Sequence, residues 1–437
     1  MELDAGNTAW VLIASALVLL MVPGLALFYG GLTRAKSKVN MLMMNLSALA
    51  IVSLLWVAYG YSVAFKGTGA VIGDFTAAGL RDLQDAVTST GLPELLFVVF
   101  QMMFAGITVA LVSGAVAERM KFSSWLVFAV VWASVVYFPV AHWVWGGGFI
   151  GNRDTGIGAL DFAGGTAVHV NAGAAAFGLI LVLGKRLGWP HRDHKPHNMS
   201  LVLLGTGLLW FGWFGFNAGS ELAADGIAAL AFINTQVATA AGVVAWMIVD
   251  WIRLGKPTLL GSCGGAVAGL VAITPACAYV EPLGALAIGV IAGALCPFAI
   301  LLKKRLGYDD SLDVVGVHLV AGAVGSVLIG VFAVGSLVPE GVSAGLAYGG
   351  GASLLGKQAA AVGIVAVFSA LVAAVIGLVL KLTIGLRVPA EGEVAGIDTH
   401  EHAEEGYVLA YEDEDASATE QAEQADETEG ELVGAAK

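Results

Sequence analysis

The sequence predicts an all-α integral membrane protein, and its composition is the first reason. Hydrophobic residues occupy 58% of the 437 positions and charged residues only 13%, whereas soluble domains carry about 25% charged residues. The mean hydropathy is +0.83. The 59 glycines fit the same class, because small residues let helices approach one another closely in lipid.

Eleven apolar segments are each about 20 residues long, the length that a helix needs to cross the hydrocarbon core. They cover residues 8–30, 39–65, 94–117, 122–145, 166–184, 199–219, 227–250, 259–280, 283–302, 314–335 and 358–386. Only Glu2 and Asp4 are charged ahead of the first segment. A signal peptide begins with basic residues, so this segment is predicted to be the first of eleven transmembrane helices in a multi-pass protein of the cell membrane.

Basic residues are unevenly distributed among the connections. Seventeen of the 21 lysines and arginines fall in alternate connections and at the C-terminal end, which places them on one predicted side. The other four are Lys66, Arg81, Arg153 and Lys357. Connections rich in lysine and arginine stay in the cytoplasm, so we predict an external N-terminus and a cytoplasmic C-terminus.

The chain after the last apolar segment is strongly acidic. Residues 388–437 hold 16 of the 34 acidic residues and a single basic one, Lys437. A charged segment without apolar periodicity cannot bury a core. We therefore expect a transmembrane domain at 1–387 and an acidic cytoplasmic tail at 388–437, largely disordered after about residue 410.

No pattern in the sequence predicts a cofactor, a metal site or an enzyme. Cys263, Cys277 and Cys296 lie in apolar stretches and are expected to be small buried residues. The glycine-rich stretches lack the GxGxxG and GxxxxGK[ST] patterns of nucleotide-binding loops. Neither a Ser/His/Asp set nor HExxH occurs, which makes a membrane hydrolase the least favoured function. A basic footprint for nucleic acid is absent as well.

Two segments resemble each other. Residues 161–174 read DFAGGTAVHVNAGA and residues 310–323 read DSLDVVGVHLVAGA, each with an aspartate eight residues before a histidine and then VHxxAGA. They belong to the fifth and tenth expected helices. Two halves of five helices have opposite orientations, so the pattern predicts an inverted 5+5 repeat, with the eleventh helix outside it.

His169 and His318 are the histidines of this repeat. Ionisable groups inside membrane helices usually mark a substrate or proton path, and equivalent positions of an inverted repeat converge near the midplane. We predict that the two imidazoles meet there, each offering one donor and one acceptor to a small polar permeant. The alternative is two separate histidines that each bond a helix carbonyl.

Asp161 precedes the fifth helix on the predicted outer side. It is expected to cap that helix, to attract a cation, or both. For Asp310, on the predicted cytoplasmic side, a solvated charge or a cap is favoured.

Aromatic residues gather on the same predicted side as Asp161. They occur in HWVWGGG (142–148) and WFGFNAGS (213–220). Interfacial belts account for many such residues. An aromatic face with a hydroxyl would instead hold a small cation by cation–π attraction and one hydrogen bond. Phe104 lies at a depth in the third helix that suits a gate.

Over roughly residues 8–400 the chain resembles the Amt/Mep/Rh family of ammonium transporters, and the Amt branch more than the Rh branch. The stretch LDFAGGTAVHVNAGAAAFGLILVLGKR (160–186) is similar to the family signature, and HWVWGGG, GWFGFNAGS, LLGSCGGAVAGLVAITPACAYVEP and DVVGVH match in order. GLRVPAEGEVAGIDTHEHAEEGY resembles the C-terminal region of bacterial and archaeal members. The acidic extension after Tyr407 departs from familiar members.

This resemblance implies roles for individual residues. Trp145 and Ser220, with Phe104, correspond to an outer ammonium-recruiting site that Asp161 supports. Phe104 and Phe216 correspond to a stacked gate. His169 and His318 correspond to the paired pore histidines, and Trp213 lies in one of the matching motifs. The family also implies a homotrimer and, for bacterial members, a PII-type (GlnK) regulator on the cytoplasmic face.

The function expected is ammonium transport, with methylammonium as an analogue. Ammonium would be recruited outside and deprotonated near the gate, and ammonia would pass the histidines. Separate proton transfer would make the transport electrogenic. Two alternatives stay open: an ammonium sensor that signals to a cytoplasmic partner, and an Rh-like channel for neutral ammonia.

Overall fold

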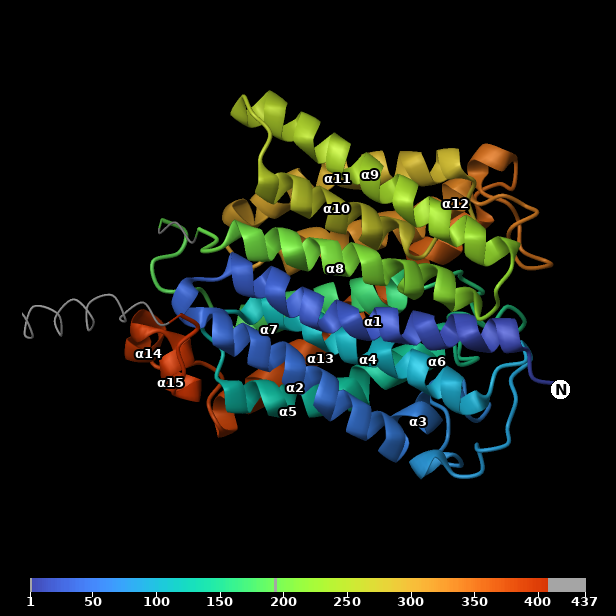
Figure 1. Ribbon diagram of the computed structural model, residues 1–437, viewed down its shortest axis with the longest axis horizontal. Coiled ribbons are helices and arrows are strands. Elements are labelled where there is room, and N and C mark those ends of the chain that lie inside the picture. Colours follow the sequence, from blue (N-terminus) through green and yellow to red (C-terminus); the bar gives the residue numbers. More distant parts are fainter. Residues whose placement is uncertain (1, 192–194, 408–437) are drawn as a thin grey trace, which may run out of the picture.

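The structure, a computed structural model, describes residues 2–191 and 195–407. Every regular element in these ranges is helical, which confirms the all-α class. The helices run side by side along one long axis (Figure 1). The tail expected to be disordered after about residue 410 lies outside the described residues.

The bundle is built from long helices that are interrupted by short π-helical segments. From the N-terminus, the α-helices are α1 (Ala5–Leu32), α2 (Lys38–Leu55), α3 (Tyr61–Phe65), α4 (Glu94–Val116), α5 (Phe122–Trp132), α6 (Phe138–Val144), α7 (Asn171–Leu183), α8 (Met199–Ala218), α9 (Gly226–Leu254), α10 (Leu259–Ile273), α11 (Pro282–Leu306), α12 (Val320–Phe332), α13 (Ser353–Thr383), α14 (Ala390–Ala395) and α15 (Ile397–His402). The π-helical segments are η2 (Trp56–Gly60), η4 (Ala133–Tyr137), η5 (Gly165–Val170) and η7 (Val315–Leu319).

Within the described ranges, ten helices are long and apolar enough to cross a membrane. The segment expected at 259–280 differs, because α10 ends at Ile273 after 15 residues. At 1.5 Å per residue such a helix is about 22 Å long, against a hydrocarbon core of about 30 Å. Thr274 keeps helical dihedral angles, but Pro275 has no backbone N–H with which to continue the helix. The buried Asn234 amide donates to the carbonyls of Cys277 and Val280 in the turns that follow.

The N-terminus and the last two helices lie at opposite ends of the bundle (Figure 1). We call the end that carries α14 and α15 the C-terminal face. Asp398 of α15 accepts hydrogen bonds from the N–H groups of Val39 and Asn40, at 3.0 and 2.8 Å. Glu401 accepts from the N–H of Phe122 at 2.9 Å. These carboxylates satisfy free N–H groups at the starts of α2 and α5, which fixes the described C-terminal segment to this face.

The two resembling segments cross at their glycines. A Cβ on Gly173 of α7 would lie 2.4 Å from the backbone nitrogen of Leu319, and one on Gly322 of α12 would lie 2.9 Å from the Cβ of His169. Only glycine allows backbones to come this close. The glycines shared by the two sequence segments therefore bring the two histidine-bearing segments together.

We expect Gly173→Ala to lower stability and transport together. The new methyl group collides with backbone at Leu319, so the segment that carries His318 must shift, and such overpacking typically costs about 1–3 kcal/mol. The thermal unfolding temperature in detergent measures the effect. Gly207→Ala in α8 is the matched control, since nothing lies within 4 Å of its Cβ. Equal unfolding temperatures for the two variants would contradict the crossing.

Candidate functional site

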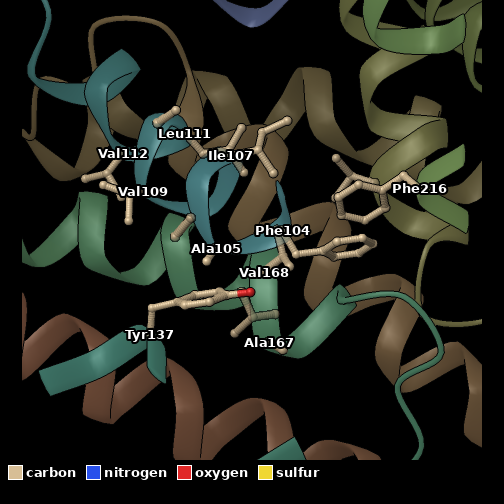
Figure 2. Close-up of a cluster of buried hydrophobic side chains, with 14 of the residues drawn as sticks. Phe104, Ala105, Ile107, Val109, Leu111, Val112, Tyr137, Ala167, Val168 and Phe216 are labelled. Atoms are coloured by element: carbon tan, nitrogen blue, oxygen red, sulfur yellow. The ribbon is translucent and has the colours of Figure 1, made fainter. Parts of the chain in front are cut away.

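Two phenylalanines from separate helices lie face to face near the end of the bundle that holds the N-terminus. The rings of Phe104 (α4) and Phe216 (α8) stack with centroids 4.1 Å apart and planes 26° apart, and Figure 2 shows them reaching toward one another. Trp145, just after α6, presents its ring edgewise to Phe104 at 6.1 Å. Both phenylalanines are 1% exposed, so the stacked pair lies in the interior of the bundle.

Trp145 and Ser220 lie at the outer edge of this aromatic group, and each is only partly buried. The Trp145 indole N–H donates to the backbone oxygen of Asp161 at 2.8 Å, which fixes the ring orientation. The Ser220 hydroxyl donates to the backbone oxygen of Phe216 at 2.8 Å. Because its proton is used there, the Ser220 oxygen is left to accept a hydrogen bond. The predicted recruiting residues are therefore neighbours of the stacked rings.

The Asp161 carboxylate accepts four backbone hydrogen bonds at the start of η5. Its donors are the N–H groups of Gly164, Gly165, Thr166 and Ala167, at 2.8 to 3.0 Å. A carboxylate has about four lone-pair sites, so these donors occupy its acceptor capacity. The structure thus shows the capping role. The attraction of a cation by Asp161 stays a prediction.

Asp310 occupies the equivalent place before η7. It is 1% exposed, and its carboxylate accepts from the N–H of Val315 at 2.7 Å. Of the two favoured interpretations the cap is confirmed, and the solvated charge is wrong. Burial and the nearby carboxylate of Asp313 raise the pKa of Asp310 to about 6.

The two repeat histidines meet below the phenylalanines. Their Nδ1 atoms are 3.3 Å apart and their ring centroids 5.4 Å apart, with planes at 24°. The alternative prediction, in which His169 and His318 each bond a separate helix carbonyl, does not account for this contact between the two rings. In a neutral pair one Nδ1 donates and the other accepts, so one Nε2 carries a proton and the other does not. The His169 Nε2 is buried, and the described part of the chain gives it no hydrogen-bond partner.

A cavity of about 10 Å³ lies beside the histidines, roughly the room that one water-sized molecule needs. Apart from the two imidazoles and Trp213, apolar side chains line it: Met21, Leu25, Phe28, Ile107, Leu111, Val168, Leu209, Phe216 and Val267. No carboxylate from the described ranges contributes to this lining. The cavity can therefore hold a small neutral molecule, while a cation there would lack a counter-charge.

Sequence reasoning missed several supports of this site. Thr274 accepts the indole N–H of Trp213 at 2.8 Å and so fixes the ring that stacks on His169 at 5.4 Å. Gln358 of α13 donates to the backbone oxygens of Leu160 and Ser326. The position of Gln358 at the start of an apolar segment could have marked it as a functional candidate. The π-helical geometry of both histidine segments could not have been predicted, because hydrophobic periodicity carries no signal for it.

His318 also borders a second, wider cavity of about 620 Å³. This cavity extends from His318 to Arg186 and Trp189 in a connection on the C-terminal face and to Lys303 in the last turn of α11. The buried Arg186 pairs with Asp309 at 2.9 Å. Burial raises the pKa of Asp309, but Arg186 and Arg119 outweigh it, and the net shift is downward. We call this cavity the vestibule.

A bundle of apolar helices that encloses stacked phenylalanines, a narrow chamber and a wider vestibule indicates a multi-pass membrane transporter, not an enzyme. The comparisons with known proteins specify the class further. The model of the Ammonium Transporter Family matches residues 9–407, and the chain belongs to this family.

Members of this family are similar to the chain in both sequence and structure. An ammonium transporter of Mycobacterium tuberculosis (strain ATCC 25618 / H37Rv) is 52% identical, over 93% of this chain and 91% of the relative. The crystal structure of Candida albicans Mep2 is similar with a TM-score of 0.84 at 35% identity, covering 89% of this chain and 88% of that one. A structure described as a sensor Amt protein has a TM-score of 0.83 at 31% identity, covering 91% and 98%.

Proposed function

We propose that this protein takes up ammonium through the line of sites described above. Trp145, Ser220 and Phe104 bind the ion at the outer mouth, where the charge of Asp161 adds attraction. The ion loses a proton near the Phe104–Phe216 pair. Ammonia then passes His169 and His318 into the vestibule. The observation that carries this proposal is the single-molecule chamber with two imidazoles and no carboxylate in its lining.

Selection between ammonium and potassium must be chemical, because the two ions are nearly alike in size and charge. Ammonium donates directional hydrogen bonds and can release a proton, whereas potassium can do neither. A bare cation in the middle of a bilayer is costly, and the lining offers it no compensating charge. Ammonia avoids that cost, so the chamber favours the species that only ammonium can produce.

The paired histidines also offer a route for the released proton. With the two Nδ1 atoms within hydrogen-bonding distance, a proton taken up at one Nε2 can be matched by release at the other. Transport is then electrogenic. Without such a transfer the protein would be a channel for neutral ammonia, the Rh-like alternative.

The proposed topology has eleven passes. The N-terminus and the C-terminal face lie at opposite ends of the bundle (Figure 1), which requires an odd number of crossings. Ten long helices therefore need the shorter α10 as a further pass. The basic connections lie on the C-terminal face, so that face is cytoplasmic and the N-terminus is outside, with the two halves as an inverted repeat.

Assembly and regulation belong to the same proposal. A homotrimer and a PII-type regulator on the C-terminal face are what the family resemblance implies. The similarity to a sensor Amt protein favours one further candidate, a protein that reports ammonium binding to a partner. Transport and sensing are compatible in one chain.

Uptake into proteoliposomes tests the proposal. We expect the purified protein to accelerate entry of labelled methylammonium at least tenfold over protein-free liposomes, with unlabelled ammonium competing and potassium not competing. Binding of ammonium with uptake no faster than in protein-free liposomes would overturn transport in favour of sensing.

A further inference from the structure

A buried histidine that lines neither of the two cavities bonds two backbone carbonyls. The His142 side chain, in α6, is 0% exposed. Its Nδ1 lies 3.0 Å from the carbonyl oxygen of Ala64 in α3. Its Nε2 lies 2.6 Å from the carbonyl oxygen of Gly69, in the connection from α3 to α4. The imidazole therefore joins three separate segments of the chain.

The chemistry of these two acceptors bears on the protonation of the ring. A carbonyl oxygen only accepts hydrogen bonds, and a neutral imidazole has one N–H and one bare nitrogen. In either neutral tautomer, a nitrogen lone pair of His142 would face a carbonyl oxygen at 3.0 Å or less. Only the imidazolium donates to both oxygens. The contact of 2.6 Å is short for a neutral N–H···O bond, as charge-assisted hydrogen bonds are.

Two features stabilise a positive charge on this ring. His142 lies in the last turn of the helix Phe122–Val144, and the dipole of a helix favours cations at its C-terminal end. The two carbonyl oxygens supply polar partners, without which a buried charge is very costly. Glu94 pairs with Lys66, the residue that follows α3. In the described ranges no carboxylate forms an ion pair with His142, so the carbonyls and the helix end carry this stabilisation.

The turn that carries Trp145 is built directly on this contact. The backbone oxygen of His142 accepts the N–H groups of Gly146 and Gly148, at 3.0 and 2.9 Å. A Cβ on Gly146 would lie 1.9 Å from the Ala64 oxygen and 2.8 Å from the His142 Nδ1. A shift of the imidazole relative to α3 therefore also shifts the backbone on both sides of Trp145.

We propose that His142 is a positioning residue for Trp145 and acts as a doubly protonated imidazolium. It binds the carbonyls of Ala64 and Gly69 to the last turn of α6, and so holds the Trp145 ring at the outer mouth. Loss of either N–H frees one of these carbonyls and loosens the turn. The effect on ammonium recruitment rests on the proposed transport function, whereas the protonation of the ring does not.

Solid-state nitrogen NMR of the full-length protein in lipid bilayers tests the protonation. Ala141–His142 is the only Ala–His pair in the sequence, so labelling of alanine carbonyl carbons and of histidines identifies the His142 resonances without any substitution. We expect both ring nitrogens to resonate as protonated nitrogens at neutral pH. A resonance of the unprotonated type for either nitrogen would overturn the imidazolium.

Uptake of methylammonium into proteoliposomes tests the positioning. His142→Gln leaves an uncharged donor in the place of Nε2 alone, and His142→Asn leaves one in the place of Nδ1 alone. We expect both variants to raise the concentration for half-maximal uptake at least threefold, while the maximal rate per folded protein changes less than twofold. The matched control is His191→Gln, in an exposed connection, which should change neither quantity.

Two uptake results would overturn the positioning role of His142: a half-maximal concentration equal to that of the control in both variants, or a fall in the maximal rate alone. The NMR measurement uses the wild-type protein and needs no transport. If the wild-type protein takes up no methylammonium, the proposed function fails, while the protonation of His142 is still decided by its spectrum.

Discussion

Replacing His169 by leucine is expected to lower the ammonium-evoked current at least tenfold while ammonia still crosses. Leucine has a similar volume, so the chamber stays filled, but the contact between the two Nδ1 atoms is lost. Without it the proton has no partner at the narrowest point, where a charge is costly. Neutral ammonia needs no such relay. Current on solid-supported membranes and stopped-flow ammonia permeability measure the two effects separately.

The control for this variant is His191→Leu, because His191 is exposed in a connection and does not line the chamber. It should keep the full current. A His169→Leu protein with undiminished current would remove the histidine pair from the proton path.

Asp161→Ala is expected to destabilise the protein by at least about 3 kcal/mol. Four backbone N–H groups lose their acceptor at once, and a buried donor left unsatisfied costs about 1–3 kcal/mol. Asp161→Asn keeps one oxygen and should lose less. Thermal unfolding in detergent measures the difference, with Asp154→Asn as control, since Asp154 is exposed in the same connection.

The asparagine variant separates the two roles predicted for Asp161. Capping predicts a lower unfolding temperature for Asp161→Asn than for Asp154→Asn, with little change in the methylammonium concentration for half-maximal uptake. If attraction of the cation is its main role, the unfolding temperature stays unchanged and that concentration rises.

Apolar length and composition were enough to predict the long helices of this fold. They could not predict that α10 stops at Ile273, because that depends on Pro275 and on the distant amide of Asn234. They also treated residues 388–437 as one acidic segment. Asp398 and Glu401 instead find free N–H groups at the starts of α2 and α5, a tertiary arrangement that composition does not contain.

The candidate site was predictable where the sequence duplicates itself. The shared VHxxAGA pattern marked His169 and His318, and its glycines explain why their segments meet. Thr274 and Gln358 were missed because each acts through a single partner far away in the chain. Their residue types are ordinary, and only the folded geometry shows what they support.

In the proposed mechanism, the pathway admits ammonium by removing its proton and carries charge only through that proton. Current on solid-supported membranes that contain the wild-type protein tests it most directly, with ammonium and potassium applied at equal concentration. We expect a current with ammonium and none with potassium. A potassium current of comparable size, or no current with ammonium despite rapid uptake, would contradict it.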